Sequence, residues 1–111
     1  MERTEMNDRE LLEMAAKAAG HYVQFSESWN DFLIEPIEME TIWNPLTYDD
    51  DALRLAIKLQ LQIRPNGYDV MVVARLPSHI AVAEACDHKD PYAATRRAIV
   101  RAAAEIGRGM K

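Results

Sequence analysis

The chain contains few of the residues on which small catalytic sites are usually built. It has one cysteine, Cys86, which excludes an internal disulfide and is typical of a protein from a reducing compartment. Its four glycines are too scattered to form a phosphate-binding loop. No serine lies in a Gly-x-Ser-x-Gly sequence, the usual setting of a hydrolase nucleophile. The sequence therefore predicts no catalytic residue, no cofactor and no enzymatic activity.

Long apolar runs and a basic excess are also missing. No run approaches the ~20 apolar residues that cross a bilayer, and residues 1–6 lack the pattern of a signal peptide. We therefore expect a cytoplasmic protein without membrane contact. The net charge of −5 disfavours a nucleic-acid partner, because affinity for phosphate comes mainly from basic side chains. The length of 111 residues predicts a single domain, residues 1–111, with residues 1–6 as a candidate disordered tail.

Three segments repeat apolar residues at helical spacing. The expected helices cover residues 8–19, 49–59 and 91–106, and their expected N-caps are Asn7, Thr47 or Asp49, and Asp90. Gly20 and Gly107 are expected to end the first and the last helix, because glycine accepts the conformation that often follows a helix. The second helix has a wide apolar arc that includes Leu53 and Ile57, which predicts that it is covered on most sides.

The strand signals lie between the second and third helices. Leu61–Arg64 and Tyr68–Leu76 flank Asn66-Gly67, a typical type I′ hairpin turn. Val70, Val72 and Ala74 are expected on one face of the second strand. Ile80–Cys86 is expected to form a third strand, with a helix as the alternative because of its alanines.

Residues 21–42 form a variable insert that the pattern does not resolve. Short strands at His21–Phe25, Asp31–Glu35 and Glu38–Trp43 are one interpretation, and a long functional loop is the other. Helices segregated over an antiparallel sheet predict an α+β fold, with a small antiparallel sheet and helices packed against it like an α-β-α sandwich.

The last helix has two faces on a helical wheel. The expected inner face consists of Tyr92, Thr95, Ala98, Ile99, Ala102, Ala103 and Ile106. The outer face carries Arg97, Arg101 and Arg108, with Val100 and Ala104 between them. Apolar positions between arginines suggest a protein contact, since arginine is enriched at interfaces. The alternatives are a phosphate contact and a solvated face on which Arg101 pairs with Glu105.

The two tryptophans have different expected roles. Trp29 lies in a polar segment, and with Phe32 it suggests an exposed anchor for a partner, with packing as the alternative. Trp43 precedes Asn44-Pro45 and is expected to hold that helix start against the core.

Three groups of polar residues raise the question of a chemical site. Cys86-Asp87-His88 resembles part of a metal site, but its spacing fits no known zinc motif. Asp49-Asp50-Asp51 offers carboxylates for magnesium, and it also suits the first turn of a helix, where the dipole favours negative charge. Cys86 with His21 would form a nucleophile and a base, yet nothing in the sequence marks an activated thiol. We therefore expect no metal ligand.

Three helix-related segments carry a resemblance to a known group. They are Asp8-Arg9-Glu10-Leu11-Leu12, Trp43-Asn44-Pro45-Leu46-Thr47 and Asp90-Pro91-Tyr92-Ala93-Ala94. In these segments and their order, the chain resembles small proteins of tailed phages and prophages, the NinX-like group and the phage ABA-sandwich domains. The resemblance implies a phage origin and an α+β fold, and it brings no catalytic residues.

Taken together, these features predict a non-enzymatic phage or prophage accessory protein. It would bind a host or phage macromolecule, for host takeover or counter-defence. One alternative is a homo-oligomer that binds a small ligand or nucleotide, and another is a weak nucleic-acid binder through the C-terminal helix. The candidate contact residues are Arg97, Val100, Arg101, Ala104, Arg108, Trp29 and Phe32.

Overall fold

The computed structural model describes residues 7–34, 42–67, 69–76, 80–87 and 89–110. Within these residues the chain forms three helices and two three-stranded antiparallel sheets, which confirms the α+β fold class. The elements are α1 (Asp8–Ala19), β1 (Val23–Ser26), β2 (Asp31–Ile34), β3 (Ile42–Trp43), α2 (Asp49–Lys58), β4 (Gln62–Asn66), β5 (Asp69–Arg75), β6 (Ile80–Cys86) and α3 (Pro91–Arg108). No helix in these ranges is both long and apolar enough to span a membrane.

The first and last helices start as their sequences predict. The Asn7 side chain accepts a hydrogen bond from the Glu10 amide at 2.8 Å, and the Asn7 amide donates to the Glu10 carboxylate at 3.1 Å. Gly20 follows α1 with a φ of 78°, as a left-handed cap. The Asp90 carboxylate accepts from two amides in the first turn of α3, both at 3.0 Å. Local capping chemistry therefore fixes both helix starts.

The start of α2 differs from the prediction. Tyr48 is the N-cap, and its side chain makes no capping hydrogen bond. Neither Thr47 nor Asp49 takes that role, because a turn in which the Asn44 carbonyl accepts from residues 47 and 48 leads the chain into the helix. The first turn of α2 consequently lacks side-chain capping.

The strands divide between two sheets rather than one. The sheet orders are β1-β2-β3 and β4-β5-β6. Residues 21–42 thus include a hairpin of β1 and β2, whose connection holds Asn30 at a φ of 52°. Residues 35–41, and with them most of the predicted strand Glu38–Trp43, lie outside the described residues.

The turn between β4 and β5 lies one residue later than predicted. Asn66 is the last residue of β4 and pairs with Asp69, and it is not among the described residues with positive φ. Gly67 takes the left-handed conformation instead, with a φ of 65°. The predicted alternation on β5 is confirmed, and the buried residues facing α3 are Val70, Val72 and Ala74.

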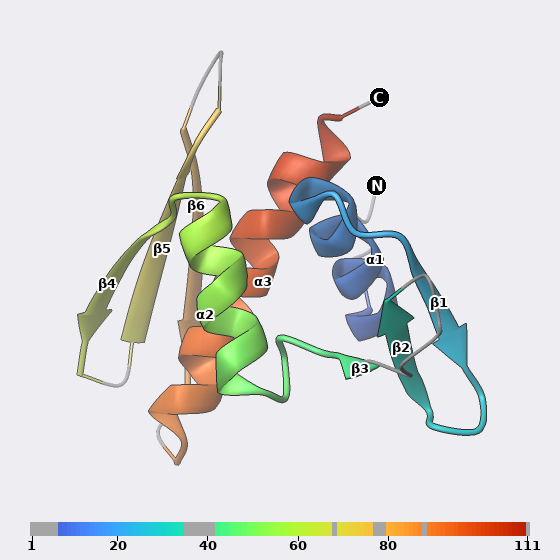
Figure 1. The fold of residues 1–111 in the computed structure, drawn as a ribbon. Helices are drawn as coiled ribbons and strands as arrows, with labels where there is room; N and C mark the ends of the chain where they lie inside the picture. The colour runs from blue at the N-terminus through green and yellow to red at the C-terminus, as the bar shows by residue number, and fades with distance from the viewer. Residues whose placement is uncertain (1–6, 35–41, 68, 77–79, 88, 111) are drawn as a thin grey trace, which may run out of the picture.

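Helix α3 lies at the centre of the molecule (Figure 1). It packs against α1 on one side and against β5 and β6 on the other, and α2 also rests on it. Small residues permit this close packing: a Cβ added to Gly107 would overlap the Met14 carbonyl oxygen and lie 2.8 Å from the Met14 carbonyl carbon. The prediction that Gly107 ends the helix is therefore wrong, since α3 continues to Arg108. Gly107 is instead the position at which the backbones of α3 and α1 come into contact.

The prediction that other elements cover α2 on most sides is wrong, because one apolar side of this helix is exposed. Leu53 is 56% exposed and Ile57 is 67% exposed, because α3 covers only the face with Ala52, Leu55 and Ala56.

Candidate functional site

The two apolar residues of the interaction face predicted on α3 are buried, whereas its arginines reach the surface. Val100 and Ala104 have no exposed surface. The reason is that α1 covers the side of α3 opposite the sheet, so the wheel has no outer face at these positions. Tyr92, predicted to point inward, is 71% exposed. Val100 and Ala104 are thus core residues and not candidates for a partner contact.

The three arginines of that face are each engaged within the chain. Arg97 pairs with Asp8 at 3.0 Å, and Arg108 pairs with Glu105 at 3.0 Å. Arg101 donates to the main-chain carbonyl of Glu84 in β6, also at 3.0 Å, rather than to Glu105. These contacts explain the row of arginines on α3 without a phosphate ligand.

The predicted aromatic anchor divides into one exposed and one buried residue. Trp29 is 52% exposed in the β1–β2 connection. Phe32 is only 3% exposed and packs edge-on against Phe25, with the ring centroids 5.3 Å apart. Phe32 is therefore not an anchor, because it lies on the buried face of β2. Trp43 is 4% exposed, which confirms its expected packing in the core.

Strand β6 forms one edge of its sheet. Antiparallel strands alternate between residues that bond to a neighbour and residues whose backbone groups point away from it. Since the Glu84 carbonyl accepts from Arg101, residues 80, 82, 84 and 86 direct their backbone groups away from β5. Among the described residues, β5 is the one strand that pairs with β6. Arg101, a predicted contact residue, thus lies at this edge.

The face of this sheet that points away from α3 is partly apolar. Ile80 is 55% exposed and Val82 is 52% exposed, and on β5 beside them Met71 is half-buried and Val73 is buried. The described helices lie on the other side of the sheet (Figure 1). A cleft of about 560 Å³ lies at the turn end of the sheet, where Met71 and Glu84 are among its lining residues. We call Met71, Val73, Ile80 and Val82 the outer sheet patch.

Cys86 belongs to the same sheet and is exposed, and its surroundings do not activate the thiol. A hydrogen bond with Asp69 is the main cause that raises the pKa of the Cys86 thiol, so the reactive thiolate is disfavoured. Cys86 and His21 line different clefts. No group of three or more metal-binding side chains occurs in the described part of the chain, and His88 lies outside it.

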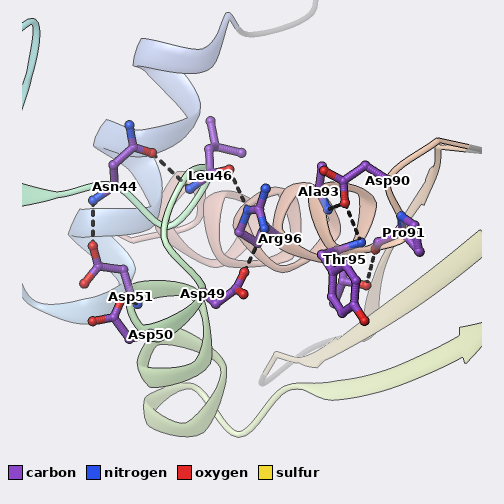
Figure 2. A network of polar contacts seen from close by, with 11 residues as sticks. Asn44, Leu46, Asp49, Asp50, Asp51, Asp90, Pro91, Ala93, Thr95 and Arg96 are labelled. Carbon is purple, nitrogen blue, oxygen red and sulfur yellow. Dashed lines mark hydrogen bonds and ion pairs between the residues drawn. The ribbon is translucent and has the colours of Figure 1, made fainter.

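The three aspartates at the start of α2 serve separate structural contacts (Figure 2). Asp49 pairs with Arg96 of α3 at 2.7 Å, and Arg96 also donates to the Leu46 carbonyl at 2.9 Å. Asp51 accepts from the Asn44 amide at 2.9 Å. The three carboxylates therefore do not converge on one metal position.

A second, smaller cleft of about 240 Å³ lies between α1, β2, β3 and α2. Its apolar lining residues are Ala19, Ile34, Trp43 and Leu55. Its polar lining residues are His21, Asp51, Arg54 and Lys58. The His21 and Trp43 rings meet edge to face, with their centroids 5.7 Å apart. We call this site the Trp43 cleft.

Burial changes the ionisation of two groups in the Trp43 cleft. Burial, with the nearby Lys58, lowers the pKa of the His21 imidazole, which favours the neutral ring at pH 7. Burial also raises the pKa of the Asp51 carboxyl, against the opposing effects of the Asn44 amide and Arg54. The cleft thus combines a neutral imidazole, two cations and one carboxyl group.

Sequence reasoning missed the Trp43 cleft, because its lining residues come from four separate elements and their flanking residues, spread from Ala19 to Lys58. The i,i+4 spacing of Arg54 and Lys58 was the one local signal for it. Comparisons with protein-family models, curated proteins and solved structures give no match for this chain.

Proposed function

We propose that the protein is a non-enzymatic accessory protein that binds another protein through the edge of β6 and the outer sheet patch. The main supporting observation is that Ile80 and Val82 are both more than half exposed on β6, a seven-residue edge strand whose outer edge pairs with no other described strand. Exposed edge strands pair readily with other chains, and proteins usually protect them for that reason.

The two edges of this sheet differ in a way that supports the proposal. The β4 edge contains Pro65, which has no N–H to offer a further strand. The β6 edge contains no proline, and one of its carbonyl groups, that of Glu84, accepts a hydrogen bond from Arg101. An incoming strand would therefore find donors and acceptors at β6 and would replace the Arg101 contact.

The chemistry of the edge defines the partner segment. It would be extended, since only a strand matches the alternating backbone groups of β6. Apolar side chains on one of its faces would cover Ile80 and Val82. A basic side chain would lie near Glu84, which is exposed on the same face in a protein of net charge −5.

The biological setting of this proposal rests on the sequence. The resemblance to small phage and prophage proteins favours a host or phage protein as the partner, in host takeover or counter-defence. The engagement of Arg97, Arg101 and Arg108 within the chain argues against nucleic acid as the partner.

Site-specific photo-crosslinking in cells tests the proposal. A photoreactive residue at Ile80 is expected to give a discrete adduct with one other protein. The same residue at Tyr22, which is 78% exposed beside α1, serves as the control and should not give that adduct.

Substitution Val82→Pro adds the decisive comparison. It removes an N–H that points away from β5, so the β5–β6 pairing stays intact while strand addition is blocked. The Ile80 adduct should disappear in this variant. An adduct that persists, or one with twice the mass of the chain, would refute binding of a partner strand at β6.

A further inference from the structure

The Trp43 cleft has the size and lining of a site for a small organic molecule. Its volume of about 240 Å³ corresponds to about eight waters at liquid density. Three of its lining residues are almost fully covered by the rest of the protein and offer only a small apolar surface at the base of the cleft: Trp43 is 4% exposed, Leu55 3% and Ala19 1%. A molecule in the cleft would therefore place an apolar body against a fixed aromatic surface.

The cations of the cleft are available to a ligand. Arg54 and Lys58 form no ion pair or side-chain hydrogen bond with any residue in the described part of the chain. They are one helical turn apart on α2 and line the same cleft. A single anionic group between them would gain two charge-assisted contacts.

The Lys58 side chain also lies close to α1. Its Nζ atom lies 4.0 Å from the position that a Cβ on Gly20 would occupy, at the C-terminal end of α1. The negative end of a helix dipole attracts an ammonium group. The exposed Lys58 side chain therefore has its ammonium group near the C-terminal end of α1, beside the cleft.

The charge balance limits the ligand class. Arg54 and Lys58 contribute two positive charges and Asp51 at most one negative charge, so the site favours a monoanion. The mainly apolar walls disfavour a phosphate or a dianion, which would lose hydration without enough donors.

We propose that the Trp43 cleft binds a small monocarboxylate with a flat or branched apolar body. The body would pack against Trp43 and Leu55, and the carboxylate would lie between Arg54 and Lys58. None of the residues that line this cleft belongs to the β4-β5-β6 sheet, so the site is separate from the β6 edge and adds a small-ligand function to the proposed protein binding.

Tryptophan fluorescence of the full chain, with 3-phenylpropionate as the probe, tests the proposal. Trp29→Phe leaves Trp43 as the one tryptophan, since the chain has two. Saturable quenching or a spectral shift of Trp43 is expected with 3-phenylpropionate and not with the uncharged 3-phenylpropanamide. An equal response to both probes, or no response at millimolar concentration, would overturn the proposal.

Charge variants in the same Trp29→Phe background locate the carboxylate. Arg54→Gln and Lys58→Gln should each weaken binding about tenfold, as expected for loss of a charge-assisted contact. Arg64→Gln on β4, outside the cleft, is the matched control and should leave the affinity unchanged. Unchanged affinity in both cleft variants would overturn the site, and circular dichroism of each variant confirms that it is folded.

Discussion

Gly107 is the residue at which the backbone of α3 meets the backbone of α1. No side chain fits there, because the Met14 carbonyl occupies the space of a Cβ. The position therefore depends on a missing side chain and not on a turn conformation.

Replacing Gly107 with alanine should lower the free energy of unfolding by about 2–3 kcal/mol, because the two helices must move apart. Gly109→Ala is the control, since its Cβ would lie 3.7 Å from the nearest atom, the Ile106 carbonyl oxygen. It should change stability by less than about 0.5 kcal/mol. Denaturant unfolding measures both, and equal values for the two variants would contradict the close helix contact.

His21 should make stability depend on pH near neutrality. Its pKa in the folded chain is below the ordinary value of 6.5, so the unfolded chain binds a proton more readily. Its contribution is complete above pH 6.5 and is lost as the pH falls through the folded pKa. Stability should therefore be lower at about pH 5.5 than at about pH 7.5.

Urea unfolding at the two pH values measures this effect, and His21→Gln should flatten the slope between them. The raised pKa of Asp51 acts with the opposite sign, so the comparison of wild type with His21→Gln isolates the histidine. An identical slope in both proteins would contradict the buried environment of His21.

At the scale of elements, α2 is the helix with the fewest supports. Among the described helices its main contact is with α3, it exposes Leu53 and Ile57, and no side-chain hydrogen bond caps it. Arg96 of α3 ties its N-terminal end to the core through Leu46 and Asp49 (Figure 2).

Arg96→Ala should cost about 2 kcal/mol, since it removes charged hydrogen bonds of a side chain that is only 17% exposed. Arg97→Ala offers a matched comparison, because the Arg97–Asp8 pair is exposed on both sides. Exposed pairs contribute about 0.5 kcal/mol. Thermal unfolding of both variants is the measurement. A loss of stability in Arg97→Ala as large as that in Arg96→Ala would contradict the role of Arg96 in fixing α2 to α3.

The missing cap of α2 predicts a stabilising substitution. Tyr48 already has the extended backbone of an N-cap, with φ −110° and ψ 124°. Tyr48→Ser should therefore raise the free energy of unfolding by about 0.5–1 kcal/mol relative to Tyr48→Ala. Equal stability of the serine and alanine variants in denaturant unfolding would show that the helix start needs no cap.

These elements also show what the sequence can and cannot predict. The bounds of α1 and β6 follow from the sequence because capping and alternation are local. The burial of Val100 does not follow, because a helical wheel cannot tell whether one or two partners cover a helix. The Trp43 cleft is likewise invisible locally, since it is assembled from α1, β2, β3 and α2.

At the scale of the whole molecule, the described helices cover only one face of the β4-β5-β6 sheet (Figure 1). On the other side Ile80 and Val82 of the outer sheet patch are exposed. The edge at β4 carries proline, whereas the edge at β6 does not. The less protected edge of this sheet is therefore also the edge that we propose as the binding site.

Residue-resolved amide hydrogen exchange along β6 tests this account most directly. In the protein alone, the amides of Val82 and Glu84 should exchange fast, whereas those of Ala81 and Ala83 should be protected by pairing with β5. In complex with the crosslinked partner, Val82 and Glu84 should become protected as well. Slow exchange of Val82 and Glu84 in the protein alone, or fast exchange in the complex, would contradict strand addition at the β6 edge.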